Sequence, residues 1–362
     1  MKRSMVPGFG PHVAFAKPEF DPRAFEQTEC GRNSELLHEI YYRYPNDPMH
    51  PEVLRYWEEW GAKKELFDSD IDSGIGEYSV FTPLDMTSDK KYALIYCSHG
   101  GSDKINMAET YGFAHLVGTE KLICVCPWNG DSNNSNVEKD FKRIVHTLLE
   151  KGYPIDTERL YAVGFSSGSG ATGRLTLDCP EMLAAVAPCP GPNTFNHGMN
   201  IMEVPAKLLE NEKMRVPIIC VGGTMDAGDQ YPLRDENACR NFNIWMENIS
   251  KVHNYQQITH EHCLKLCRDG STKIKRVFGL DFHAEYICYL EGTYWYGGDY
   301  NDEEGNCVAR LVSVEGMPHG QSKFFAPVIW EFLRHYSKDA KTGASVYTSF
   351  PKGSSELGAR RK

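Results

Sequence analysis

The 362-residue chain has no apolar run that approaches the roughly 20 residues of a membrane-spanning helix. It also lacks an excess of positive charge: its formal net charge is -10, and only Arg360–Lys362 gathers basic side chains. Nucleic acids and anionic membrane surfaces attract clustered Lys and Arg, so we expect neither as a partner. The first ten residues carry two basic side chains without a following apolar stretch of signal-peptide length. We therefore expect a cytoplasmic protein.

Internal repeats and low-complexity tracts are missing as well. With 41% hydrophobic and 24% charged residues, the composition is that of an ordinary soluble globular protein. The 12 cysteines include Cys97, Cys124, Cys126 and Cys220, which lie in apolar, strand-like runs where free cysteine behaves as a small core residue. We expect reduced cysteines rather than a disulfide framework.

The chain divides into three parts. Residues 1–75 predict an arm followed by helices near 34–41 and 51–60, packed on the core. Residues 76–338 predict an α/β domain, because strands alternate with helices; this pattern is typical of a mostly parallel, doubly wound sheet with helices on both faces. Strands are expected at 77–81, 92–97, 122–126, 160–163, 182–188, 216–221 and 308–314, with helices near 108–116, 136–151 and 323–336. Residues 339–362 predict a polar, mobile tail.

Within that domain, residues 233–305 interrupt the alternation. A helix is expected at 237–249, followed by a polar segment with His and Cys and then by the aromatic block Tyr286–Tyr296. We interpret this part as an insertion that includes a β-hairpin near the mouth of an active site.

The strongest chemical motif is Gly164-Phe-Ser166-Ser-Gly168. It follows the apolar run 160–163 and fits G-x-S-x-G, the nucleophile elbow, in which a strained strand-to-helix turn lifts the serine hydroxyl above the sheet. Serine is a weak nucleophile that needs a base, an acid that orients the base, and donors for the oxyanion. Ser166 is therefore the candidate nucleophile.

An acid and a base follow in the expected chain order. Asp226 comes directly after the predicted strand 216–221 and small residues, at the sheet edge where ligands of open α/β folds bind. Asp229 has similar reach and remains an alternative, as does a plain turn-forming role for Asp226. His319 lies after the last predicted strand and before the last helix, which makes it the candidate base.

Oxyanion donors are expected in two places. His99-Gly100-Gly101 follows the strand 92–97, where the H-G-G type of loop belongs, and its glycines let backbone N–H groups approach an oxyanion. We predict donors from Gly101 or Ser102 and from Ser167, with His99 beside the substrate; a plain turn is the alternative.

Two further patterns contain metal-ligand residue types. His260-Glu-His262-Cys263 with Cys267 fits no standard zinc spacing, and the acidic run 297–305 lacks the ligand order of an EF-hand. We expect no metal and no cofactor, and a solvated hairpin turn at 297–305.

Taken together, these stretches resemble the α/β-hydrolase esterases related to polyhydroxybutyrate depolymerases and feruloyl (cinnamoyl) esterases. The resemblance spans roughly residues 90–335 and runs through 99–101, 137–141, 153–168, 184–187, Gly191, Asp226 and His319. It implies an α/β-hydrolase fold with Ser166, Asp226 and His319 as nucleophile, acid and base.

The expected function is that of a serine esterase acting through an acyl-enzyme on a small-molecule or oligosaccharide-linked ester. Trp295, in the aromatic block, is a candidate for stacking against a hydroxycinnamoyl group, although core packing explains that block equally well. A serine peptidase or amidase of the same fold remains an alternative, as does an inactive hydrolase-fold binding protein. The oligomeric state is not indicated.

Overall fold

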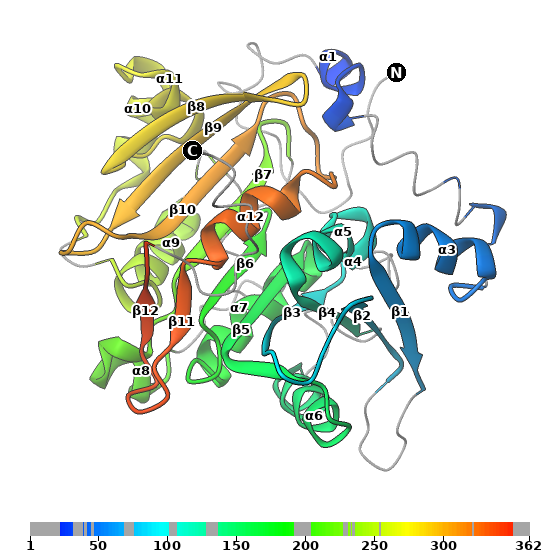
Figure 1. Ribbon diagram of the computed structural model, residues 1–362. Coiled ribbons are helices and arrows are strands. Elements are labelled where there is room, and N and C mark those ends of the chain that lie inside the picture. Colours follow the sequence, from blue (N-terminus) through cyan, green and yellow to red (C-terminus); the bar gives the residue numbers. More distant parts are fainter. Residues whose placement is uncertain are drawn as a thin grey trace.

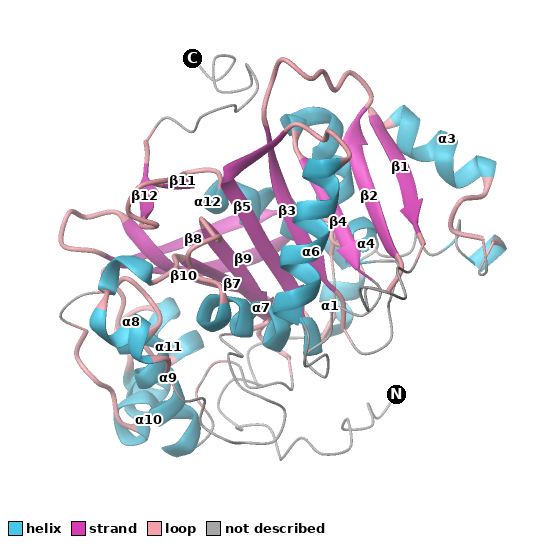
Figure 2. Cartoon of the chain, turned by 90° about the horizontal axis from the view of Figure 1, so that it is seen from below, coloured by secondary structure: helices cyan, strands magenta, loops and turns pink. Residues whose placement is uncertain are grey.

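The computed structural model describes residues 22–31, 39, 42–44, 47–68, 76–100, 107–127, 137–191, 204–226, 231, 233, 236–252, 255–320 and 322–349. In this part of the chain, a 10-stranded sheet forms the centre of the molecule, and helices cover both of its faces (Figures 1 and 2). No helix within it combines the length and the apolarity needed to cross a bilayer.

The strands follow the order β1-β2-β4-β3-β5-β6-β7-β10-β9-β8 across the sheet. Their bounds are β1 Ala62–Phe67, β2 Tyr78–Pro83, β3 Tyr92–Ser98, β4 Ile123–Pro127, β5 Ile155–Phe165, β6 Ala185–Cys189, β7 Ile218–Gly223, β8 Ala284–Leu290, β9 Thr293–Asn301 and β10 Cys307–Val314. β4, β3, β5, β6, β7 and β10 run parallel, whereas β2 is antiparallel to both of its neighbours and β9 and β8 continue the sheet in antiparallel fashion. The doubly wound α/β sheet predicted from the alternation is confirmed.

Two apolar cores explain why the central strands read as continuous apolar runs. Successive side chains of β3 point to opposite faces, so Leu94 and Tyr96 enter one core and Ile95 enters the other. α6 (Val137–Glu150) and α7 (Ser167–Asp178) bury their apolar residues in the first core. α5 (Phe113–Leu116) and α12 (Phe325–Leu333) fill the second, on the other face of the sheet (Figure 1).

The N-terminal part adds to this domain. α3 (Pro51–Glu59) begins with a proline in its first turn and buries Trp57, whose ring meets the ring of Phe81 edge-on at 5.4 Å. β1, which the sequence analysis did not predict, pairs with β2 and lies beside α3 (Figure 1). The short α1 (Pro22–Glu26) is also described, whereas most of the helix expected at 34–41 lies outside the described residues.

The helix expected at 108–116 is broken in the structure. α4 (Met107–Thr110) and α5 are separate, and a π-helical turn follows at Val117–Lys121. Gly112 causes the break: its φ is +85°, and a Cβ there would lie 2.2 Å from the carbonyl oxygen of Lys323.

The predicted insertion contains more regular structure than expected. α9 (Glu236–Asn248) was predicted, but the polar segment after it forms α10 (His260–Asp269) and α11 (Lys273–Phe278). The expected hairpin is present as β8–β9, and β9 pairs with β10, so the hairpin prolongs the main sheet (Figure 1). α8 (Ala206–Glu210) and a 3₁₀ turn at Glu212–Met214 lie between β6 and β7.

The expectation of a polar tail after Lys338 needs correction. β11 (Tyr336–Lys338) pairs with β12 (Ser345–Tyr347) in a second, two-stranded sheet, and the hydroxyl of Tyr161 in β5 donates to the carbonyl oxygen of Tyr336 at 2.6 Å. Ser345 is buried. This hairpin therefore belongs to the folded domain, although its loop residues are as polar as those of a tail.

Candidate active site

Ser166 stands at a sharp turn between β5 and α7. Its backbone has φ 54° and ψ -116°, a conformation that non-glycine residues rarely adopt and that marks functional turns. Its N–H donates to the carbonyl oxygen of Cys189 at 2.8 Å, which ties the turn to the end of β6. The strand, turn and helix predicted from the motif are present.

The two glycines of the motif are required by close backbone contacts. A Cβ on Gly164 would lie 2.0 Å from the carbonyl oxygen of Gly168, and one on Gly168 would lie 2.2 Å from that of Ser98. Both distances are far below any real carbon–oxygen contact. The elbow therefore brings the start of α7 against the end of β3, which carries the predicted oxyanion loop.

Ser167 is the first residue of α7, where backbone N–H groups have no acceptor within the helix. The N–H of Ser169 donates to the carbonyl oxygen of Ser166 at 3.0 Å, and the amides of Ser167 and Gly168 precede it in the first turn. A helix N-terminus favours negative charge. This geometry supports the prediction that the Ser167 amide is an oxyanion donor.

Asp226 and His319 form a hydrogen-bonded pair. Both carboxylate oxygens of Asp226 lie 3.0 Å from Nδ1 of His319. The Asp226 side chain is fully buried, whereas that of His319 is 35% exposed. The buried acid therefore orients an imidazole whose other side remains accessible. Asp229, the sequence-based alternative, lies outside the described residues.

The loops that carry this pair are joined by hydrogen bonds. After β7, the N–H of Thr224 donates to the carbonyl oxygen of Val314 at 3.0 Å, and the N–H of Met225 donates to that of Met317 at the same distance. In return, the N–H of Gly316 donates to Oγ1 of Thr224 at 2.8 Å. The acid and the base therefore sit on one rigid unit.

The pair also lies against the elbow. The ring of His319 is 4.6 Å from the ring of Phe165, the residue before Ser166, with an interplanar angle of 31°. The three predicted residues follow the carboxyl ends of β5, β7 and β10, which all open to the same edge of the sheet. The structure thus brings Ser166, Asp226 and His319 to one place.

The loop after β3 reaches the same place. A Cβ on Gly100 would lie 3.3 Å from Cβ of Ser166, so this backbone passes directly beside the candidate nucleophile. Gly101 and Ser102 lie outside the described residues. His99 is only 3% exposed, and its Nδ1 contacts the carbonyl oxygen of Gly100, so its ring lies inside the protein rather than on an open binding surface.

Trp295 does not have the position that a substrate-stacking residue needs. Its side chain is 2% exposed and meets the ring of Phe325 in α12 edge-on at 6.0 Å. Residues of β9 alternate between the two faces of the sheet, and Trp295 points into the core beneath α12. The stacking prediction for this residue is therefore corrected to core packing.

The two metal-like patterns have other roles. His262 lies 2.9 Å from Asp281 through Nε2, while Cys263 and Cys267 are buried on another side of α10. In the acidic run, Asp302 accepts backbone N–H groups from Glu304 and Asn306 and closes the turn itself. Across the described ranges, no three His, Cys, Asp or Glu side chains come together as metal ligands. All 12 cysteines are free thiols in the structure.

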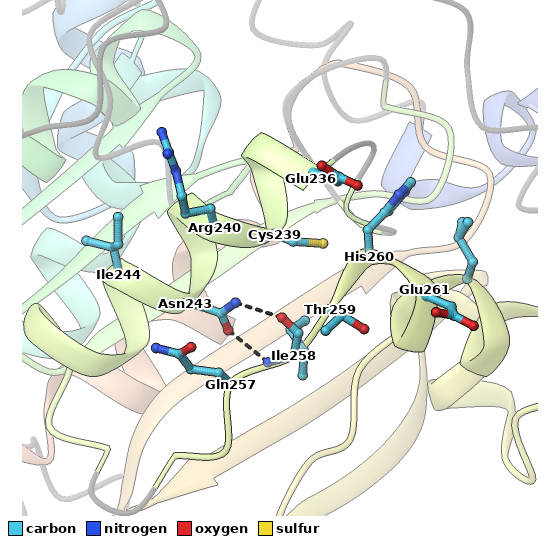
Figure 3. Close-up of a pocket in the computed structure, with 11 residues that line it drawn as sticks. Glu236, Cys239, Arg240, Asn243, Ile244, Gln257, Ile258, Thr259, His260 and Glu261 are labelled. Atoms are coloured by element: carbon cyan, nitrogen blue, oxygen red, sulfur yellow. Dashed lines mark hydrogen bonds between the residues drawn. The ribbon is translucent and has the colours of Figure 1, made fainter.

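A separate cavity of about 560 Å³ lies between α9 and the start of α10 (Figure 3). The carboxamide of Asn243 crosses its floor, donating to the carbonyl oxygen of Ile258 at 2.8 Å and accepting its N–H at 3.0 Å. Its lining comprises Glu236, Cys239, Arg240, Asn243, Ile244, Gln257, Ile258, Thr259, His260, Glu261 and Leu264. None of the three candidate catalytic residues lines it. No sequence motif indicates this cavity, because its walls come from α9, the loop at 257–259 and α10.

The strand order with antiparallel β2, the elbow and the Asp226–His319 pair define the class: the chain has the α/β-hydrolase fold. No family model matches the sequence. The chain is similar to a bifunctional acetylxylan esterase/xylanase from Neocallimastix patriciarum, with 28% identity over 301 residues. This match covers 78% of the chain and 36% of that relative, so the chain spans about a third of its length. The resemblance to α/β-hydrolase esterases inferred from the motifs is confirmed.

The solved structures that match this chain at low identity include proteins named as esterases and one named as a putative dipeptidyl aminopeptidase IV from Bacteroides ovatus. One is a feruloyl esterase module from Clostridium thermocellum, with 17% identity, a TM-score of 0.38 and coverage of 52% of this chain and 72% of that one. Another is a ferulic acid esterase from the anaerobic fungus Anaeromyces mucronatus, with 17% identity, a TM-score of 0.33 and coverage of 52% and 78%.

Proposed function

We propose that the protein is a serine esterase with Ser166 as nucleophile, His319 as general base and Asp226 as the orienting acid. The observation that carries this proposal is the pair of 3.0 Å contacts from the Asp226 carboxylate to Nδ1 of His319, beside a serine held at φ 54° on an elbow. A turn-forming role for Asp226 would not require a buried carboxylate bonded to a half-exposed imidazole.

The first step is acylation. Because Asp226 accepts the Nδ1–H of His319, the lone pair of Nε2 is available for the hydroxyl proton of Ser166. The serine oxygen bonds to the ester carbonyl carbon, and the carbonyl electron pair moves onto its oxygen. When the carbonyl re-forms, the bond to the alcohol oxygen breaks, and His319 returns the proton to the leaving alcohol.

The second step releases the acid. Water gives a proton to His319 and attacks the acyl carbon, and the tetrahedral species collapses with cleavage of the bond to Ser166. The histidine then reprotonates the serine. The net change is one ester and one water converted to one acid and one alcohol.

Both tetrahedral species place negative charge on the former carbonyl oxygen. The Ser167 amide at the start of α7 is one proposed donor, and the second is Gly101 or Ser102 on the loop that passes Ser166 at Gly100. Removing one such donor typically costs about 3 kcal/mol of transition-state stabilisation.

We propose an ester attached to a polysaccharide or its fragments as the substrate class. Its support is the similarity over most of the chain to a protein named acetylxylan esterase/xylanase. Acetyl and hydroxycinnamoyl groups both remain candidates for the acyl part, since the burial of Trp295 removes the residue proposed for aromatic stacking. A peptidase of the same fold would use the same three residues, so substrate panels must separate the two.

The test is labelling with a fluorophosphonate, read by peptide mass spectrometry, in the wild type and in Ser166→Ala. We expect one adduct on Ser166, loss of label in the variant, and normal labelling of the control Ser88→Ala, whose serine is exposed on a distant turn. Matched acetyl ester and acetyl amide substrates then discriminate esterase from amidase. Folded wild-type protein without an adduct would overturn the proposal.

A further inference from the structure

The hairpin β8–β9 presents a cluster of large side chains to solvent. Ile287, Tyr289 and Tyr294, here named the tyrosine platform, are 50%, 67% and 46% exposed. Tyr289 and Tyr294 lie directly opposite each other across the two strands, and Ile287 is two residues before Tyr289, so all three share one face. Exposed apolar side chains gathered on one face are a typical mark of a binding surface.

The platform has a defined shape. The rings of Tyr289 and Tyr294 meet edge-on at 5.0 Å, and Tyr294 lies nearly parallel to Tyr296 at 6.5 Å. Tyr296 is buried, and its hydroxyl donates to Oε1 of Glu315 at 2.8 Å. A fixed residue on the same strand face therefore adjoins the exposed rings, which reduces the entropy lost when a ligand binds.

The platform lies beside the loop that carries His319. The turn of the hairpin lies at the sheet edge where β10 ends, since Trp295 is opposite Val314 (Figure 1). The N–H of Glu315 donates to the carbonyl oxygen of Tyr294 at 2.8 Å. Glu315 is four residues before His319 in the same loop. A ligand that crosses the platform therefore runs towards the catalytic histidine.

The charges around the platform favour a neutral ligand. Lys273 lies 5.8 Å from the ring of Tyr296, Glu315 accepts the hydroxyl of the same tyrosine, and Glu285 shares the strand face of Ile287, so charges of both signs flank the surface. The whole chain carries a net charge of -10, which opposes a polyanion. Tyrosines offer a flat apolar face and a hydroxyl rim, and these match the C–H faces and hydroxyl edges of neutral sugar rings.

The acyl part and the alcohol part of an ester need different binding sites on the enzyme. The acyl part bonds to Ser166, whereas the alcohol part leaves and, in a polysaccharide, continues outside the site. We propose that the tyrosine platform binds the neutral glycan that carries the ester, as a subsite on the alcohol side. This inference rests on the proposed function and assigns the exposed part of the aromatic block to the sugar rather than to the acyl group.

The kinetic test compares two substrates in wild type and in Tyr289→Ala/Tyr294→Ala. With acetylated xylo-oligosaccharides, we expect KM to rise about tenfold at unchanged kcat, because the platform contributes binding and not chemistry. With 4-nitrophenyl acetate, which has no glycan, both constants stay unchanged. Tyr42→Ala, which removes a tyrosine that is 88% exposed elsewhere, serves as the matched control.

Binding without turnover separates this inference from the proposed function. Ser166→Ala should be retarded in gels that contain unsubstituted xylan, and adding the two tyrosine substitutions should abolish the retardation. Unchanged KM and retardation in the tyrosine variants would overturn the subsite, as would a change of oligomeric state, which would make the platform an interface between copies. A wild type that is inactive on both esters but retarded by xylan would refute only the esterase.

Discussion

Asp226 contacts His319 through both of its carboxylate oxygens, each 3.0 Å from Nδ1. Asp226→Asn keeps the shape of this contact but places an amide N–H against a ring nitrogen that must itself donate. We expect kcat to fall by about 10⁴ while the fold is retained, as measured by initial rates and circular dichroism. Asp229→Asn is the control for the alternative acid. If that variant were the inactive one, the assignment of Asp226 would be wrong.

Gly168 tests the packing of the elbow. An added Cβ would lie 2.2 Å from a backbone oxygen of Ser98, a contact that only a shift of the backbone could relieve. Gly168→Ala should cost at least about 3 kcal/mol in urea unfolding, through overpacking. Gly305→Ala is the control, because its φ is +86° but nothing lies within 4 Å of the new Cβ. The Gly305→Ala variant should lose only about 1 kcal/mol of unfolding free energy.

His115 gives the protein a sensitivity to acid. Burial lowers the pKa of this histidine to about 3, with a smaller contribution from Lys323, and its Nε2 lies 2.8 Å from the hydroxyl of Tyr56 in α3. In the unfolded chain this histidine takes up a proton near pH 6.5, whereas in the folded protein it stays neutral down to about pH 3. The free energy of unfolding therefore falls as the pH drops below 6.5. His115→Gln should flatten the plot of unfolding free energy against pH between pH 6.5 and 5, a range in which the titration of carboxylates contributes little to the slope. Equal slopes in the two proteins would contradict a buried neutral imidazole.

Lys338 should make the stability of the protein depend on pH in the alkaline range. Burial, together with the positive charge of Lys251, lowers the pKa of Lys338 from its usual 10.5 to about 7. Between these values the unfolded chain holds a proton that the folded chain lacks, so stability rises with pH. Lys338→Met should reduce this slope, with Lys251 (pKa lowered by burial to about 8) supplying the remainder, and should stabilise the protein at pH 7, in thermal unfolding from pH 7 to 10. Lys63→Met, at a side chain that is 58% exposed, should change neither the dependence of stability on pH nor the stability at pH 7.

Trp295 should matter for stability rather than for substrate choice. Its side chain is 2% exposed, so Trp295→Ala leaves a cavity beneath α12 and should cost about 3–5 kcal/mol. The ratio of kcat/KM for methyl ferulate and 4-nitrophenyl acetate should stay constant in the folded variant. A selective loss of the ferulate activity would restore the stacking role.

The sequence predicted those parts of the fold in which the local residue pattern matches the burial of the same residues in the structure. β3, β7 and the part of β5 at 160–165 are buried throughout and therefore appear as continuous apolar runs. The elbow was equally clear, since its glycines are fixed by backbone contacts that no other residue allows. The acid and the base could be inferred because each directly follows a strand.

Other features depend on contacts that the sequence does not display. β1 contains Lys63, Lys64 and Glu65, which look like a surface loop, yet Lys64 forms a fully buried ion pair with Glu109 at 2.7 Å. α10 and α11 are polar on their outer sides, so their apolar positions form only a weak pattern. Trp295 and Tyr294 are neighbours in one aromatic block, and only the register of β9 decides which is buried and which is exposed.

The position of β10 between β7 and β9 imposes an order on assembly. Among the described strands, the hairpin β8–β9 is synthesised before β10 and meets the parallel strands only through β10, so it must wait for residues 307–314 before it can join them. The same strand leads into the loop of His319, which arrives after the serine and the aspartate. A nascent chain that has not yet released residues 307–319 therefore lacks the proposed base, and the strand that joins the hairpin to the parallel strands is also the one that leads into the loop of His319.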